Sequence, residues 1–165
     1  MNSTTRMALA LLATMAATPA LADDCDVVKA ATIAAAETPH TSVQTTTTNG
    51  KTVTSSVIQT QTTTYVQIGG VWHASPTSAQ DRLKLITDNF KTAKITCTKI
   101  GTDTINGEPV TVYANHLENE GVVADSKIWI SAKGLPLKTE NHPEGGAAST
   151  STSDYEHFAP PPGVK

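Results

Sequence analysis

The chain has 165 residues, with 12 basic and 15 acidic side chains and a formal net charge of -3 at pH 7. This length suits one small domain, and a mildly acidic chain has no electrostatic attraction to nucleic acid. Charged residues make up 16%, below the roughly 25% of an average globular domain. Threonine takes much of their place in the first half of the chain. Because its side chain is β-branched, this composition favours strands.

The first 22 residues have the layout of a secretory signal peptide. A polar start is followed by an apolar run and by small residues at alternate positions in Ala20-Leu21-Ala22. We therefore expect cleavage after Ala22 and export to the periplasm. An uncleaved anchor is the alternative, but Thr18 and Pro19 interrupt the run before the about 20 apolar residues that span a bilayer. We expect no transmembrane segment in the mature chain.

The two cysteines, Cys25 and Cys97, are expected to form a disulfide. After export both thiols would lie in an oxidising compartment. Closing a loop of this size restricts the unfolded chain by about 4 kcal/mol in the entropic model. Two unpaired buried cysteines are the alternative; a redox pair is disfavoured because no CxxC spacing is present. A lipid anchor on Cys25 is also disfavoured, because Asp24 stands where such signals carry a small residue.

The first half of the mature chain reads as a helix followed by hairpins. Apolar residues at helical spacing predict a helix over 26–37, which Pro39 ends. Asn49-Gly50 is a strong hairpin signal between two alternating segments, and Gly69-Gly70 marks a second turn. Strands are expected over 40–48, 51–59, 61–68 and 71–73.

The second half repeats this order. A helix is expected over 79–90, capped by Thr77 or Ser78, with Arg82 on its polar side. Asn106-Gly107 predicts another hairpin turn. Strands are expected over 94–100, 109–117, 124–131, 135–141 and 149–157, and the tail at 159–165 has too many prolines to pair.

These elements predict an α+β domain over 23–158 with a single curved antiparallel sheet of about nine strands. Two helices cannot cover both faces of such a sheet. We therefore expect an unclosed half-barrel whose concave, apolar face wraps the helices. The residues expected on this face, where a ligand would bind, are Val53, Val57, Val66, Ile68, Val110, Val112, Ile128, Ile130 and Leu137. On the same alternation, Tyr113 and Trp129 point to the outer face, where they could form a patch for a protein partner.

Several short motifs resemble those of a known family. Asp125–Ser131 is a strand with a central tryptophan, and Leu135–Glu140 is a strand of the form hydrophobic-Pro-x-basic followed by an acidic turn. The turn at 106–108 and the Gly70–Trp72 segment also stand where that family has similar features. In this order the motifs resemble the bacterial outer-membrane lipoprotein carrier superfamily (LolA/LolB-like), of which the chain would be a distant member.

The resemblance implies an unclosed β-barrel whose helices cover a hydrophobic cavity, located in the periplasm and binding acyl chains. The chain departs from the carriers in being shorter, rich in threonine and poor in aromatic residues. No counterpart of their functional arginine can be placed, because Arg82 is the only arginine after the signal peptide and is expected on the polar side of its helix.

No motif indicates catalysis or metal binding. The 5 histidines show no HxxxH or HxH spacing, and Asp154, Glu156 and His157 do not share one face of a strand. No serine lies in a GxSxG or SxxK setting. We therefore expect no cofactor, no metal and no enzyme activity, and a monomer.

Two hypotheses follow. The first is an exported, non-enzymatic periplasmic protein that binds a lipid, acyl chain or other apolar ligand on the concave face. The alternative is an envelope protein-protein interaction module whose concave face is filled by its own helices.

Overall fold

The computed structural model describes residues 23–162 and Val164. The predicted signal peptide, 1–22, lies outside the described residues, as does part of the proline-rich tail. The helices and strands follow in the order α1 (Asp24–Glu37), β1 (His40–Thr48), β2 (Lys51–Gln59), β3 (Thr64–Ile68), β4 (Val71–Ser75), α2 (Ala79–Thr92), β5 (Lys94–Ile105), β6 (Glu108–Asn119), β7 (Val122–Ser131), β8 (Pro136–Pro143) and β9 (Ala148–Asp154).

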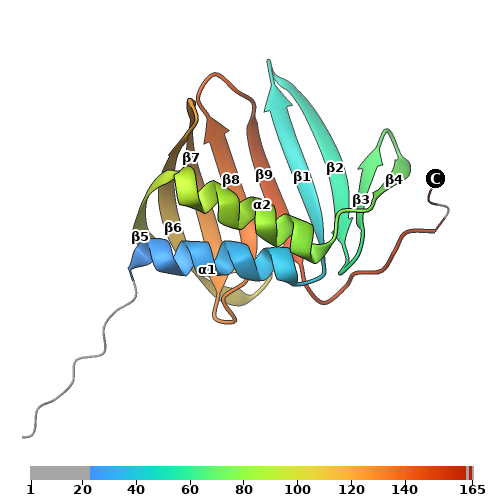
Figure 1. Cartoon of the computed structure of the whole chain (residues 1–165), viewed down its shortest axis with the longest axis horizontal. Coiled ribbons are helices and arrows are strands. Elements are labelled where there is room, and N and C mark those ends of the chain that lie inside the picture. Colours follow the sequence, from blue (N-terminus) through green and yellow to red (C-terminus); the bar gives the residue numbers. More distant parts are fainter. Residues whose placement is uncertain (1–22, 163, 165) are drawn as a thin grey trace, which may run out of the picture.

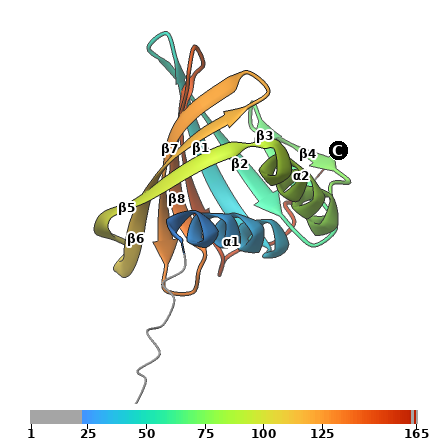
Figure 2. The same cartoon turned by 60° about the vertical axis from the view of Figure 1, so that its left-hand side comes forward.

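All the strands form one 9-stranded sheet in the order β4-β3-β2-β1-β9-β8-β7-β6-β5. Every neighbouring pair is antiparallel. β4 and β5 lie at the two edges and do not pair with each other, so the sheet curves without closing (Figures 1 and 2). The predicted α+β half-barrel is confirmed.

The hairpin turns have local causes that can be read in the sequence. At Asn49-Gly50 and Asn106-Gly107 both residues have positive φ, 50° and 74° in the first turn and 51° and 84° in the second. Asparagine and glycine tolerate that conformation, which matches the twist of the flanking strands. The turn between β6 and β7 uses Glu120-Gly121 with φ of 49° and 83°. Its glutamate carries no turn signal, so the sequence did not predict this turn.

Helix and strand ends differ from the predicted ones by a few residues. Helix α1 begins two residues early because the carboxylate of Asp23 accepts from the Cys25 amide. At α2 the predicted cap is confirmed: Ser78 and Asp81 form a reciprocal capping box. β9 ends at Asp154 instead of 157, because its carboxylate accepts the following backbone amides and turns the chain.

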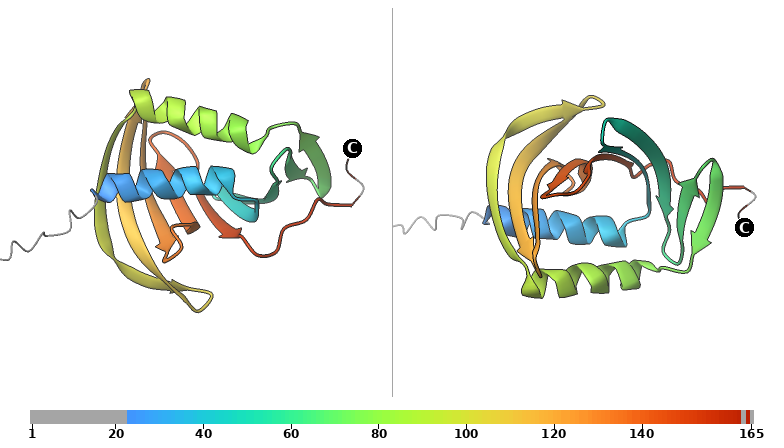
Figure 3. Two further views of the ribbon diagram at one scale, coloured as in Figure 1. Left: turned by 60° about the horizontal axis from the view of Figure 1, so that its bottom comes forward. Right: turned by 90° about the horizontal axis from the view of Figure 1, so that it is seen from above.

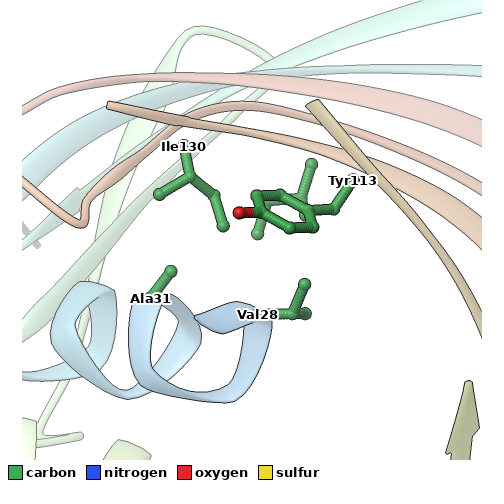
Figure 4. Close-up of a cluster of buried hydrophobic side chains, with 5 residues drawn as sticks. Val28, Ala31, Tyr113 and Ile130 are labelled. Carbon is green, nitrogen blue, oxygen red and sulfur yellow. The ribbon is translucent and has the colours of Figure 1, made fainter. Parts of the chain in front are cut away.

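Helix α1 lies inside the curve of the sheet, and α2 packs against α1 (Figure 3). Val28 and Ala31 of α1 point toward Tyr113 and Ile130 of the sheet, and with Ile128 these residues form a buried cluster (Figure 4). Burying a valine or isoleucine side chain stabilises the fold by roughly 1.5–3 kcal/mol. The apolar contact between α1 and strands β6 and β7 is therefore the core of the domain.

A disulfide joins the start of α1 to β5. Cys25 and Cys97 are bonded across a sequence separation of 72 residues, with their Cα atoms 5.0 Å apart. The predicted bridge is confirmed. It attaches the first turn of α1 to the strand at one edge of the sheet.

Breaking this bridge should lower stability strongly. Cys25→Ser, Cys97→Ser and the double variant should each lose about 4 kcal/mol of unfolding free energy, because the unfolded chain regains the freedom of a long loop. Urea denaturation of the three variants would measure this loss. Reduced wild type is the matched control and should unfold like the variants. Two titratable thiols in the untreated protein, or a loss below about 1 kcal/mol, would contradict the bridge.

Candidate functional site

A cavity of about 520 Å³ lies between the two helices and the concave face of the sheet. It is the candidate functional site. Its lining comes from both helices and from strands β1, β2, β5, β6, β7, β8 and the end of β9. The residues are Val28, Thr32, Ala35, Ala36, His40, Gln59, Arg82, Leu85, Ile86, Phe90, Ile95, Asn115, Leu117, Ser126, Ile128, Pro136, Thr139, Asn141, Ser153 and Tyr155.

The helix side of the cavity is apolar. Leu85, Ile86 and Phe90 of α2 and Val28 and Ala35 of α1 line it. The amphipathic pattern of α2 explains this arrangement, because residues spaced by one turn project from the same side of a helix. Leu85 remains largely exposed, so a ligand in the cavity would cover surface that now faces water.

The sheet side of the cavity is mostly polar. We call Asn115, Ser126, Thr139, Asn141 and Ser153 the polar floor; all five line the cavity. Their neighbours across the strands extend this chemistry, since Asn141 lies opposite Ser149 and Thr139 opposite Ser151 on β9. Directly opposite residues of an antiparallel pair point to the same face. The expectation of a uniformly apolar concave face was wrong for the central strands.

Six residues predicted for the concave face do lie on it by register. Ile128 and Ile130 belong to the cluster that packs on α1, and Ile128 also lines the cavity. On the other side of the polar strands, Val57 lies opposite both Ser42 and Val66, and β1 residue Ser42 alternates with cavity-lining His40. Val53 and Ile68 follow at even spacing along the same strands.

These outer concave residues do not line the cavity. Val53 is 58% exposed and Ile68 64% exposed, and neither they nor Val57 and Val66 belong to the cavity lining. Helix α1 makes its sheet contacts with β5, β6 and β8. We call Val53, Val57, Val66, Ile68 and Val71 the apolar wing.

Val110 and Val112 were placed on the wrong face. Val112 lies opposite Trp129, whereas Tyr113 lies opposite Ile128. Because Tyr113 and Ile128 pack on α1, Val110 and Val112 point away from the helices. They form a second buried cluster with Trp129, against which Leu137 and Ile105 pack. A register shift in the pairing of β7 with β8, beside Pro136, puts Leu137 in this cluster.

The predicted partner patch of Tyr113 and Trp129 is also wrong. The two side chains lie on opposite faces of the sheet and are 7% and 6% exposed. Trp129 does point away from the helices, as expected, but its indole N–H donates to the Asp103 carboxylate at 2.9 Å. The ammonium group of Lys138 lies 4.3 Å from the ring centroid. Residues of its own sheet therefore cover Trp129.

Arg82 is buried instead of lying on a polar helix surface. Only 9% of it is exposed. Its Nε donates to the Ala36 carbonyl, its Nη2 to the carbonyls of Ala36 and Thr60, and its Nη1 to the Thr77 carbonyl and the Thr64 hydroxyl, at 2.9–3.3 Å. All five N–H groups of the guanidinium are thus used by neutral acceptors.

These bonds hold several segments together at one end of the cavity. Ala36 has one of the last carbonyls of α1, which has no amide partner within the helix and favours a nearby cation. Thr60 precedes β3, and Thr77 precedes α2. Burial lowers the pKa of Arg82 from 12.5, whereas the nearby Asp81 carboxylate raises it. A guanidinium stays protonated in proteins at neutral pH. The helical period alone could not reveal acceptors that come from other segments.

His40 and Tyr155 lie side by side at the cavity wall. Their ring centroids are 4.8 Å apart. His40 Nδ1 lies 2.8 Å from the Thr38 carbonyl oxygen, and burial lowers the pKa of His40 below 6.5 despite this bond. Burial also raises the pKa of Tyr155 to about 12. Both groups are therefore neutral in the folded protein at pH 7.

None of the helices in the described part of the chain is long and apolar enough to span a membrane. Among the same residues, no three His, Cys, Asp or Glu side chains come together as ligands for a metal ion. On the outer face, His116 and His142 are both opposite Asp125 across neighbouring strands. His116 Nδ1 lies 2.7 Å from the Asp125 carboxylate, a contact that the sequence did not predict.

The chain has no match among family models and none among curated proteins. Its fold does match solved structures. LprF from Mycobacterium bovis gives a TM-score of 0.50 at 11% identity, over 82% of this chain and 94% of LprF. MucB gives 0.51 at 14% identity, over 87% of this chain and 62% of MucB. The MucA/MucB complex of Pseudomonas aeruginosa gives 0.51 at 14% identity, over 84% and 59%.

The fold is LolA-like. At 11–14% identity these matches show the fold alone, which is the fold that the sequence resemblance implied. The chain spans less than two thirds of the MucB chains that it matches. At such low identity the LolA-like fold is common to these proteins, while the residues that line the cavity are this chain's own.

Arg82 should be essential for stability. Arg82→Lys should lose about 1–3 kcal/mol of unfolding free energy, because an ammonium group cannot serve all the acceptors of a planar guanidinium. Arg82→Met should lose more. Urea denaturation measures both. Lys84→Met is the control, because Lys84 lies two residues away on the exposed side of α2, and it should change stability by less than about 0.5 kcal/mol. An Arg82→Lys protein as stable as wild type would refute this role.

The two histidines should give stability opposite pH dependences. The lowered pKa of His40 means that the unfolded state binds its proton more readily, so this histidine's contribution is present above pH 6.5 and is lost as pH falls below it. The unfolding free energy by which wild type exceeds His40→Gln should therefore shrink from pH 7.5 to 5.5.

Hydrogen bonding to Asp125 raises the pKa of His116, so the unfolding free energy by which wild type exceeds His116→Gln should shrink as pH rises above 6.5. Chemical denaturation from pH 5.5 to 7.5 measures the pH dependence of stability for wild type and both variants. A stability difference that stays constant with pH would disprove the pKa shift of that histidine.

Proposed function

We propose that this protein is a non-enzymatic binding protein of the bacterial envelope, which holds an apolar or amphipathic ligand in the cavity between its helices and the concave face. The cavity itself carries the proposal. Its volume of about 520 Å³ falls within the range of about 300–1,000 Å³ typical of small-molecule sites. Helices that filled the concave face would leave a smaller space. The cavity volume therefore favours a ligand-binding protein over an interaction module whose concave face is filled by its own helices.

The apolar side of the cavity supplies the binding energy. Leu85, Ile86 and Phe90 form a continuous aliphatic and aromatic surface on α2. Each methylene of an acyl chain buried against it gains about 0.8 kcal/mol. The LolA-like fold supports this reading, because the resemblance to lipoprotein carriers implies a ligand in the same position.

The bonding of the polar groups supports binding and not catalysis. His40 is the one histidine among the residues described as lining the cavity, and its Nδ1 contacts a backbone carbonyl. The Ser126 hydroxyl donates to Asn115, and the Tyr155 hydroxyl donates to the Pro136 carbonyl. Neither hydroxyl is paired with a base that could activate it.

The compartment is proposed from two observations. The disulfide between Cys25 and Cys97 requires an oxidising environment to persist in most bacteria. The first 22 residues read as a cleaved signal peptide. Together they support a mature protein that begins at Asp23 and works in the periplasm.

Filling the cavity should abolish ligand uptake. Ala35 lines the cavity, so Ala35→Phe should occupy its volume and weaken binding of the uncharged dye N-phenyl-1-naphthylamine at least about tenfold. Fluorescence titration measures the affinity. Ala30→Phe, on the exposed side of the same helix, is the matched control and should bind like wild type.

Native mass spectrometry of protein isolated from its own periplasm provides a second readout and should show an adduct that Ala35→Phe lacks. Protein that carries no adduct and takes up no dye would overturn the proposed function. An equal loss in Ala30→Phe would show that the effect does not arise in the cavity.

An envelope interaction module remains the second candidate, and the apolar wing favours it. Val53, Ile68 and Val71 are exposed and lie on the concave face by register. MucB, which has the same fold, forms a complex with MucA. Two results together would favour this candidate over ligand binding. Wild-type protein would take up no dye, and it would retain a partner that the Val53→Ser, Ile68→Ser double variant loses.

A further inference from the structure

The polar floor contradicts a purely hydrocarbon occupant. Thr139 and Asn141 line the cavity, yet among the described residues neither side chain makes a hydrogen bond within the protein. Both can bond water when no ligand covers them. An alkyl chain laid over them would remove that water, and a polar group buried without a hydrogen-bond partner weakens binding.

The charges around the cavity are equally unsuited to an ionic head group. Arg82 is the only cationic side chain among the lining residues, and all of its N–H groups already bond neutral acceptors. His40 is neutral because burial lowers its pKa. The lining contains no carboxylate and no lysine. A buried carboxylate, phosphate or ammonium group would therefore lose its hydration without gaining a partner.

The two sides of the cavity have complementary chemistry. Aliphatic side chains of α1 and α2 face hydroxyl and amide side chains of β6, β7 and β8. The hydroxyls continue beyond the cavity, because Ser149 and Ser151 lie opposite floor residues and Ser151 lies opposite Gln44. Serine, threonine and asparagine side chains can each donate and accept hydrogen bonds, which suits a ligand group that does both.

We propose that the ligand is an amphiphile with an uncharged, hydroxyl- or amide-bearing head group, which bonds the polar floor while its hydrocarbon chain lies along α2. This inference rests on the proposed function, and it narrows the ligand class from any apolar molecule to neutral polar-headed lipids. Thr139 and Asn141 are the residues that recognise the head group.

Three probes with the same chain length separate the head-group classes. Monolauroylglycerol is neutral and bears two hydroxyls, dodecanoate is anionic, and dodecyltrimethylammonium is cationic. Each is titrated, below its micelle concentration, against wild-type protein loaded with N-phenyl-1-naphthylamine. Monolauroylglycerol should displace the dye with at least about tenfold higher affinity than either ion, the equivalent of one satisfied hydrogen-bonding group. Equal or tighter binding of dodecanoate would overturn the inference and leave the proposed function standing.

Two variants test the polar floor itself. Thr139→Val keeps the β-branched shape that suits the strand but removes the hydroxyl. It should reduce the ratio of monolauroylglycerol affinity to dodecanoate affinity about three- to tenfold relative to wild type. Thr152→Val is the matched control on β9, because Thr152 lies opposite Lys138 on the other face. An unchanged preference in Thr139→Val, or the same change in Thr152→Val, would refute head-group recognition by the floor. Failure of the dye to bind at all would overturn both proposals.

Discussion

Helix α1 is held inside the curved sheet at both of its ends, and the rest of the structure depends on this. The disulfide attaches its first turn to β5, and the Arg82 guanidinium donates two hydrogen bonds to the Ala36 carbonyl in its last turn. Between these ends, Val28 and Ala31 pack on Tyr113, Ile128 and Ile130. A covalent bond, a charged hydrogen-bond network and an apolar contact thus act on one helix, and α2 packs on α1 in turn.

The cavity follows from where α1 is held. The helix contacts strands β5, β6 and β8, so the floor residues further along β8 and on β9 keep open space above them. Short hydroxyl and amide side chains cannot reach across that space to the helices. The cavity therefore combines a helix surface suited to hydrocarbon with a sheet surface suited to hydrogen bonds. This combination distinguishes it from a uniformly apolar cavity.

Local signals predicted the elements well, because their causes lie within a few residues. Asn49-Gly50 adopts the expected turn, and Ser78 with Asp81 forms the expected cap. Face assignment was less reliable. Val112 and Ile128 were both expected on the concave face. Which residues of one strand share a face with those of its neighbour is set by the pairing register, and this register places Val112 and Ile128 on opposite faces. A one-residue difference in phase reverses every side chain of a strand.

The sequence by itself determined the element order, the antiparallel sheet, the disulfide pair and the family likeness, because alternation, turn residues and cysteine count are properties of the chain read locally. Only the tertiary structure decided what each face meets. Arg82 looks like a solvated helix residue until Ala36, Thr60 and Thr64, which lie 46, 22 and 18 residues away in the chain, supply acceptors. Likewise, Asn115, Ser126 and Asn141 form one polar row only when three strands come into register, since contacts between distant segments depend on how the whole sheet curves around its helices.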